Sequence, residues 1–153
     1  MVVLGVPRNN FVSLRKNISL LKSAGYKSIL GGRIKKEVES VKEWLCALTK
    51  ENGCVHQKPM AYGERLIVSY SEKRACKDAL NRKKGIDRLE KAYKNGKVSK
   101  RNINQRGYNK FLKIENDVTV SIDYGKIEED AQWDGWKSYV TNTNFPPEEV
   151  IDL

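Results

Sequence analysis

Cysteine and histidine are scarce in this chain, which has three cysteines and one histidine among 153 residues. The cysteines, Cys46, Cys54 and Cys76, are odd in number and widely spaced, and this argues against a disulfide framework. Cys54 and His56 are two positions apart, but a closed zinc site needs about four ligands, and no Cys-x-x-Cys pair supplies the rest. We therefore expect thiols without a zinc ion.

Long apolar runs and an export signal are also lacking. No apolar run approaches the ~20 residues that a helix needs to span a bilayer. The opening stretch, MVVLGVPRNN, lacks the charged region and the long apolar segment of a signal peptide. We expect no membrane partner and a cytoplasmic location. The charged fraction of 31% is typical of a globular protein with a large solvated surface.

Sequence patterns of several common enzyme classes are missing. The chain has no Gly-rich phosphate loop, no G-x-S-x-G and no pair of histidines. Five acids near the C-terminal end have the hard oxygen atoms that Mg²⁺ prefers, but on ligand count we interpret them as a solvated acidic turn. These acids are Asp123, Glu128, Glu129, Asp130 and Asp134.

Charge is unevenly distributed along the chain. Residues 1–72 hold 12 Lys/Arg and 6 Asp/Glu (+6), residues 73–113 hold 15 and 3 (+12), and residues 114–153 hold 2 and 10 (−8), which sums to +10. A basic block of this density favours a polyanionic partner through phosphate contacts and counterion release. The expected nucleic-acid contacts in this block are Lys73, Arg74, Lys77, Arg82, Lys83, Lys84 and Arg88.

Periodicity and turn residues predict a mixture of helices and strands. The expected helices are Asn17–Gly25, Ile34–Glu51, Glu72–Asn95, Ile127–Gln132 and one that starts at Pro146-Pro147. The expected strands are Val2–Leu4, Lys27–Gly31, Cys54–Lys58, Arg65–Tyr70, Lys110–Ile114, Asp117–Tyr124 and Lys137–Thr141. Residues 96–109 are polar and poor in apolar side chains, and they predict a mobile loop. Gly85 is expected to weaken the middle of its helix by about 1 kcal/mol relative to Ala.

Several stretches occur in an order that resembles DDE-type insertion-sequence transposases, over roughly residues 16–153. They are KNISLLKSAGYKSILGGRIK, RLIVSYSEKRACKDALNRKKGIDRLEKA, DYGKIEEDAQWDGWKSYVTNT and PPEEVIDL. The resemblance implies an α+β chain with part of an RNase H-like core (β–α–β) and a mixed helix-and-strand insertion domain. It places a core remnant at residues 1–32, the insertion domain at 33–142 and the start of a core helix at 143–153.

Members of this family cleave and join DNA with three carboxylates that hold two divalent metal ions, Mg²⁺ or Mn²⁺. By the resemblance, the second Asp should end a strand just before the helix at Asn17, where Gly5-Val6-Pro7 follows the short apolar run. No acid occurs before Glu37, and the family's Glu should fall beyond Leu153. No catalytic, cofactor-binding or metal-binding residue therefore carries over. We expect an inactive fragment without a cofactor, although the intact parent would need Mg²⁺ or Mn²⁺.

Two alternatives remain open from the sequence. The chain could be a stand-alone nucleic-acid-binding module, or a structural protein in which the basic helix pairs with the acidic residues 114–134. A further expectation concerns association. The strand Lys27–Gly31 should expose an unpaired edge and apolar surface around Ile29 and Leu30, which favours a homodimer or a larger assembly unless Met1–Arg15 covers that edge.

Overall fold

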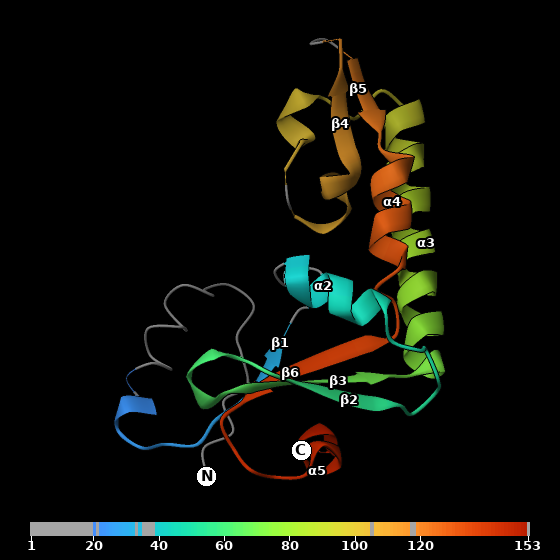
Figure 1. Cartoon of the computed structure of the whole chain (residues 1–153). Helices are drawn as coiled ribbons and strands as arrows, with labels where there is room; N and C mark the ends of the chain where they lie inside the picture. The colour runs from blue at the N-terminus through green and yellow to red at the C-terminus, as the bar shows by residue number, and fades with distance from the viewer. Residues whose placement is uncertain are drawn as a thin grey trace. The chain divides into compact units, whose positions relative to one another are not determined.

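The computed structural model describes residues 20, 22–32, 34, 39–104, 106–116 and 119–152. The chain forms two compact units, the first made of residues 1–71 and 136–153 and the second of residues 72–135. Each unit combines helices with antiparallel strands (Figure 1), so the α+β class is confirmed. The expected strand Val2–Leu4 and the segment Met1–Arg15 lie outside the described residues.

The first unit is built on a four-stranded antiparallel sheet in the order β1-β6-β3-β2. Its strands are β1 (Ile29–Gly32), β2 (Val55–Pro59), β3 (Arg65–Tyr70) and β6 (Trp136–Thr141). The β2–β3 hairpin expected from the β-branched run and its turn residues is confirmed. The expected boundary at residue 32 placed β1 in a different segment from β2, β3 and β6. The structure puts all four strands in one sheet, in which β6 lies between β1 and β3.

Each face of this sheet is covered by one helix (Figure 1). On one face, Ile29 and Ile67 pack with Val150 of α5 (Pro147–Asp152). On the other face, Leu66 and Val68 are fully buried on the side that meets α2 (Glu39–Cys46), where Lys58 of β2 donates to the Ser40 carbonyl (3.4 Å) and lies over the Trp44 ring. The alternation of side chains along β3 thus supplies both cores.

Two expectations about this unit are wrong. The helix expected to run to Glu51 ends at Cys46, where Leu48 N–H donates back to the Leu45 carbonyl in a tighter, 3₁₀-like bond (3.1 Å). The chain then turns early because Gly53 N–H must reach the Tyr70 carbonyl to begin the β2–β3 pairing. The apolar surface expected around Ile29 and Leu30 is wrong for Ile29, whose side chain belongs to the core under α5, while Leu30 is half-buried.

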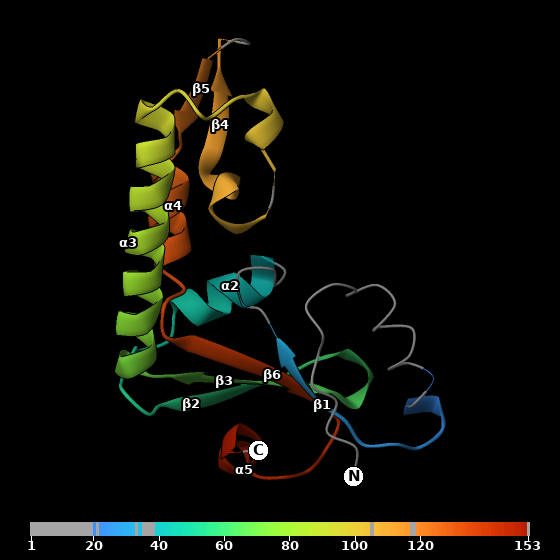
Figure 2. The ribbon, with the colours of Figure 1, turned by 180° about the vertical axis from the view of Figure 1, so that it is seen from behind.

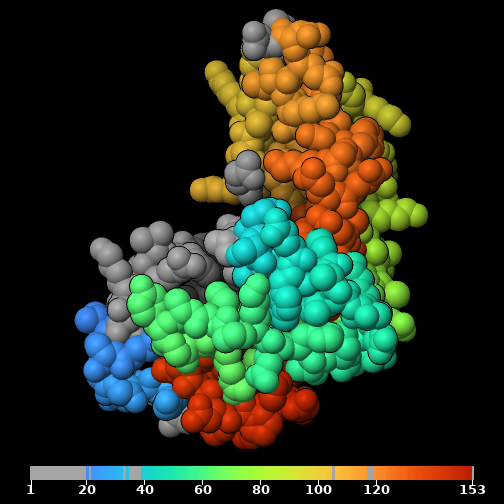
Figure 3. Space-filling view, viewed as in Figure 1, coloured from blue at the N-terminus to red at the C-terminus, as the bar shows by residue number. Residues whose placement is uncertain are grey.

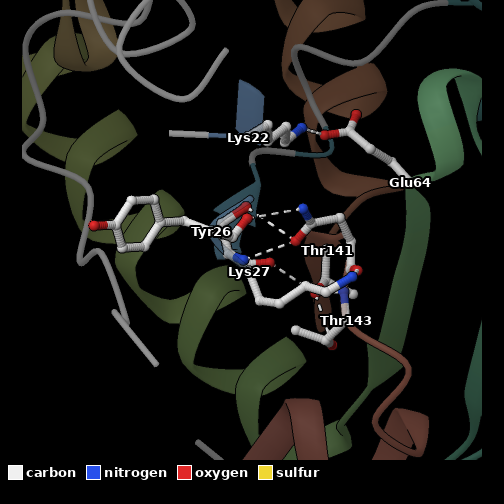
Figure 4. Close-up of polar contacts among 8 residues, drawn as sticks. Lys22, Tyr26, Lys27, Glu64, Thr141 and Thr143 are labelled. Atoms are coloured by element: carbon white, nitrogen blue, oxygen red, sulfur yellow. Dashed lines mark hydrogen bonds and ion pairs between the residues drawn. The ribbon is translucent and has the colours of Figure 1, made fainter. Parts of the chain in front are cut away.

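The end of β6 is tied to the residues before β1 by a polar cluster (Figure 4). The Asn142 side-chain oxygen accepts from Ser28 N–H (2.7 Å), and its amide donates to the Tyr26 carbonyl (3.2 Å). The Thr141 hydroxyl donates to the Ser28 carbonyl (2.8 Å) and is almost fully buried. The T-N-T sequence therefore satisfies backbone groups at a sheet edge, a role that the sequence pattern alone did not predict.

The second unit packs a long helix against a small hairpin and a short helix (Figure 2). Its elements are α3 (Glu72–Lys94), the 3₁₀ turns η3 (Lys100–Asn102) and η4 (Gly107–Phe111), β4 (Leu112–Glu115), β5 (Thr119–Ile122) and α4 (Tyr124–Ala131). Leu89 packs with Phe111, Leu112 and Ile122 in the core. Burying a leucine, isoleucine or phenylalanine side chain stabilises a fold by about 1.5–3 kcal/mol.

The connection between α3 and β4, which was expected to be a mobile loop, packs against the core of the second unit. Val98, Ile103 and Tyr108 are spread thinly through a polar segment, yet all three pack against the core of the second unit. The Tyr108 ring lies on Gly85 of α3, and its hydroxyl donates to the Asn81 carbonyl (2.6 Å). Gly85 is therefore the residue that lets this ring approach the helix, because a Cβ at that position would overlap it.

In the part of the chain that the structure describes, no helix combines the length and apolar character needed to cross a membrane.

Candidate nucleic-acid interface

The basic helix α3 is covered along one stripe only. Gly85 and Leu89 are buried, and Ala75, Arg82 and Ile86 are half-buried. Together with the half-buried Asp78 and Ala92, these positions recur every three or four residues, so they lie on one side of the helix. Glu72 in the first turn and Lys91 and Lys94 in the last turn match the helix dipole. Apart from the half-buried Asp78, Glu90 and Ala92, the other residues of this 23-residue helix are exposed, and side chains of the helix project along the right-hand edge of Figure 3.

Five exposed cations follow the outward side of this helix at intervals of three, four or seven positions, which places them on one face. None of the five has an acidic partner among the described residues. We call them the α3 cationic face: Lys73, Lys77, Lys84, Arg88 and Lys91. Four of them were expected from the charge run. Lys91 was missed because it follows the densest part of that run, although its spacing of seven from Lys84 places it on the same face.

Arg82 differs from these five because its side chain points into the unit. Its Nη1 donates to Asp134 Oδ1 at 2.6 Å, and the two side chains are only 14% and 10% exposed. The hydrogen bond to Asp134 is the main cause that raises the pKa of Arg82, which keeps the guanidinium charged. Arg82 was expected to contact phosphates, but its charge is engaged within the protein.

The other two residues expected to contact phosphates, Arg74 and Lys83, belong neither to the cationic face nor to the interior of the unit. Arg74 lies near Asp78, with Nε 3.7 Å from Oδ2, and the same carboxylate oxygen accepts from Gly135 N–H at 3.2 Å. Arg74 is thus drawn toward the turn that follows α4. Lys83 is exposed on the flank of the helix, away from the centre of the cationic face.

The acidic segment around α4 is used mainly for internal contacts. Asp130 pairs with Lys110, and Asp134 pairs with Arg82. Asp123 caps α4 by accepting from Lys126 N–H at 3.1 Å. Within residues 72–135 there are 16 Lys/Arg and 11 Asp/Glu, and this internal pairing leaves an excess of positive charge directed outward from α3.

Residues considered as metal ligands are not brought together. Cys54 lies near the Thr49 carbonyl, with Sγ 3.6 Å from the oxygen, and all three cysteines are free thiols. Among the residues that the structure describes, no group of three or more His, Cys, Asp or Glu side chains is arranged to hold a metal ion. The segment Gly5-Val6-Pro7, which stands where the family's second Asp was expected, lies outside the described residues.

Comparison of the chain with known protein families, with curated proteins and with solved structures found no match.

The cationic face has the dimensions of a backbone-binding surface. At 1.5 Å per residue, the span from Lys73 to Lys91 is about 27 Å, which corresponds to roughly eight base-pair steps of B-form DNA. Lysine and arginine side chains along such a line can each contact a phosphate without reading the base sequence. The geometry is therefore suited to binding that depends on charge and salt.

Proposed function

We propose that this chain binds DNA through the α3 cationic face, as part of a DDE-type transposase. The single observation that supports the binding is the row of five exposed cations on one side of α3, which have no acidic partner among the residues that the structure describes. A structural role, in which the basic helix is neutralised by residues 114–134, accounts for Arg82 and Asp134 but leaves these five charges without a purpose. The assignment to the transposase class rests on the sequence resemblance.

The fold shows one excursion of the chain, since residues 72–135 form a unit of their own between β3 and β6 of the first unit. The sheet itself pairs β1 with strands from residues 33–142. The proposal that residues 1–32 and 143–153 belong to an RNase H-like core interrupted by residues 33–142 therefore rests on the sequence resemblance alone. In this proposal the transposase is cytoplasmic and uses Mg²⁺ or Mn²⁺ for strand cleavage and joining.

The binding is tested by reversing Lys77, Lys84 and Arg88 to Glu and measuring the affinity for a duplex of mixed sequence between 50 and 200 mM salt. Because each phosphate contact contributes about 0.9 to the salt slope, the slope should fall by about 2.7. At the lowest salt the affinity should fall by about two orders of magnitude or more, equally for different sequences.

A matched control makes the same change of net charge elsewhere in the same unit, at the exposed residues Lys97, Arg101 and Arg106. This control should lose much less affinity and keep most of the salt slope. Equal losses in both variants would place the attraction in the overall charge and not in α3. No binding by the wild-type chain, even at low salt, would support the structural alternative.

The free edge of the sheet carries a separate proposal of self-association. β1 is an outer strand and, among the described residues, pairs only with β6. Two chains can pair such edges by a twofold axis. We expect a homodimer in sedimentation over a range of concentrations, and a concentration-independent monomer would refute it.

A further inference from the structure

The turn of the β2–β3 hairpin has an unusual residue at its tip. Tyr62 has φ 60° and ψ 32°, and Gly63 after it has φ +70°. Met60 N–H donates to the Glu64 carbonyl (2.8 Å) and Glu64 N–H donates to the Ala61 carbonyl (3.3 Å), so the turn is closed by backbone hydrogen bonds. The Tyr62 side chain is 98% exposed, more than that of any other large hydrophobic residue described.

Neither turn geometry nor packing explains a tyrosine at this position. Hairpin turns with positive φ at both central residues favour Asn-Gly, Asp-Gly or Gly-Gly, because a bulky side chain is strained in the left-handed region. At 98% exposure the Tyr62 ring makes almost no contact that offsets this strain. Strained backbone occurs preferentially at functional sites, and here it presents an exposed aromatic ring to solvent.

Each strand that leads into the turn carries a cation that contacts neutral groups of the described residues. Lys58 contacts the Ser40 carbonyl and the Trp44 ring, while Arg65 donates to the Gln57 side chain (3.0 Å) and to the Phe145 carbonyl. Among the described residues, neither cation has an acidic partner. The acid of the turn, Glu64, is itself paired with Lys22 (Figure 4). The base of the turn therefore keeps a net positive charge.

We infer that Tyr62 is a stacking platform for an unpaired nucleobase, and that the first unit binds single-stranded nucleic acid at this hairpin. Sequence-tolerant binding of single strands combines aromatic rings, on which bases stack, with cations that attract the backbone. A protein-binding anchor would be expected to lie within a larger apolar patch, whereas the neighbours of Tyr62 in the turn are the small residues Ala61 and Gly63. The inference shares the ligand class of the proposed function but uses different residues in a different unit.

The test compares Tyr62→Gly with Tyr62→Phe in the full chain. Single-strand binding is measured by fluorescence anisotropy of a labelled thymidine oligonucleotide, and of an abasic oligonucleotide with the same number of phosphates. Removing the ring should weaken binding to the thymidine strand about 5- to 150-fold, and Tyr62→Phe should change it less than about twofold. On the abasic strand Tyr62→Gly should have no effect. The control Tyr26→Ala, which removes a half-exposed ring elsewhere in the first unit, should also have none.

Thermal unfolding supplies an independent readout, since glycine relieves the left-handed strain and Tyr62→Gly should melt at a higher temperature than the wild type. Unchanged affinity of Tyr62→Gly for the thymidine strand would overturn the inference. Equal weakening on the thymidine and abasic strands would overturn it too, because the ring would then not act by stacking. Binding of duplex but not of single strands by the wild type would refute this inference and leave the role of α3 intact.

Discussion

The two sides of α3 use the same kind of residue for different purposes. Arg82 and Lys84 are two positions apart, yet Arg82 pairs with Asp134 inside the second unit while Lys84 faces solvent on the cationic face. On the covered side, Gly85 and Leu89 shape the core. The partner of a cation and its side of the helix therefore decide its role, and the total charge of a segment overstates the charge that is free to bind a ligand.

On the covered side of α3, we expect the largest loss of stability from a substitution at Gly85. Alanine at an exposed helix position stabilises by about 1 kcal/mol over glycine. Here a Cβ would overlap the Tyr108 ring, and overpacking costs typically 1–3 kcal/mol, occasionally more. Because the overpacking cost is reduced by the gain in helix propensity, we predict that Gly85→Ala lowers the free energy of unfolding by up to about 2 kcal/mol in urea denaturation. The control is Gly31→Ala, where an added Cβ meets no atom within 4 Å, and it should change little. A gain in stability at Gly85 would refute the packing of Tyr108 on α3.

The role of the outward side of α3 in DNA binding is tested by adding a positive charge to it. Asp87 is an exposed acid on α3 between Arg82 and Lys91. If the outward side contacts phosphates, Asp87→Lys should strengthen duplex binding by a few-fold and steepen the salt slope by up to about 0.9. Glu128→Lys makes the same charge change at an exposed position of α4. A similar gain from Glu128→Lys would mean that net charge, rather than the outward face of α3, governs binding.

Local patterns were enough to predict several elements. The 72–95 helix and the β2–β3 hairpin follow from dense periodic signals and turn residues, and both were found within one or two residues. The end of α2 was placed too late because its apolar stripe continues past Cys46, while the chain must turn for Gly53 to reach Tyr70. The packed connection 96–109 was missed because its three apolar side chains are isolated in the sequence.

The candidate site was predicted only in part, because some of its residues depend on partners that are far away in the sequence. Exposed lysines at helical spacing can be read from the sequence, and four of the five residues of the cationic face were named in this way. The role of Arg82 depends on Asp134, which is 52 positions away and is placed by the hairpin and α4 between them. Tyr62 gave no signal, since neither its exposure nor its positive φ follows from a local pattern. The transposase assignment and the DNA partner stay predictions.

The most direct measurement compares Arg82→Gln with Lys84→Gln, two variants that remove one charge each from opposite sides of the same turn of α3. For each, the free energy of unfolding and the salt slope of duplex binding are measured. Lys84→Gln should lower the slope by about 0.9 and leave the stability unchanged within about 0.5 kcal/mol. Arg82→Gln should cost about 1–3 kcal/mol of stability, because Asp134 loses its charged partner, and leave the slope unchanged. Equal slope losses in the two variants, without a loss of stability for Arg82→Gln, would contradict the division of α3 into a structural side and a binding side.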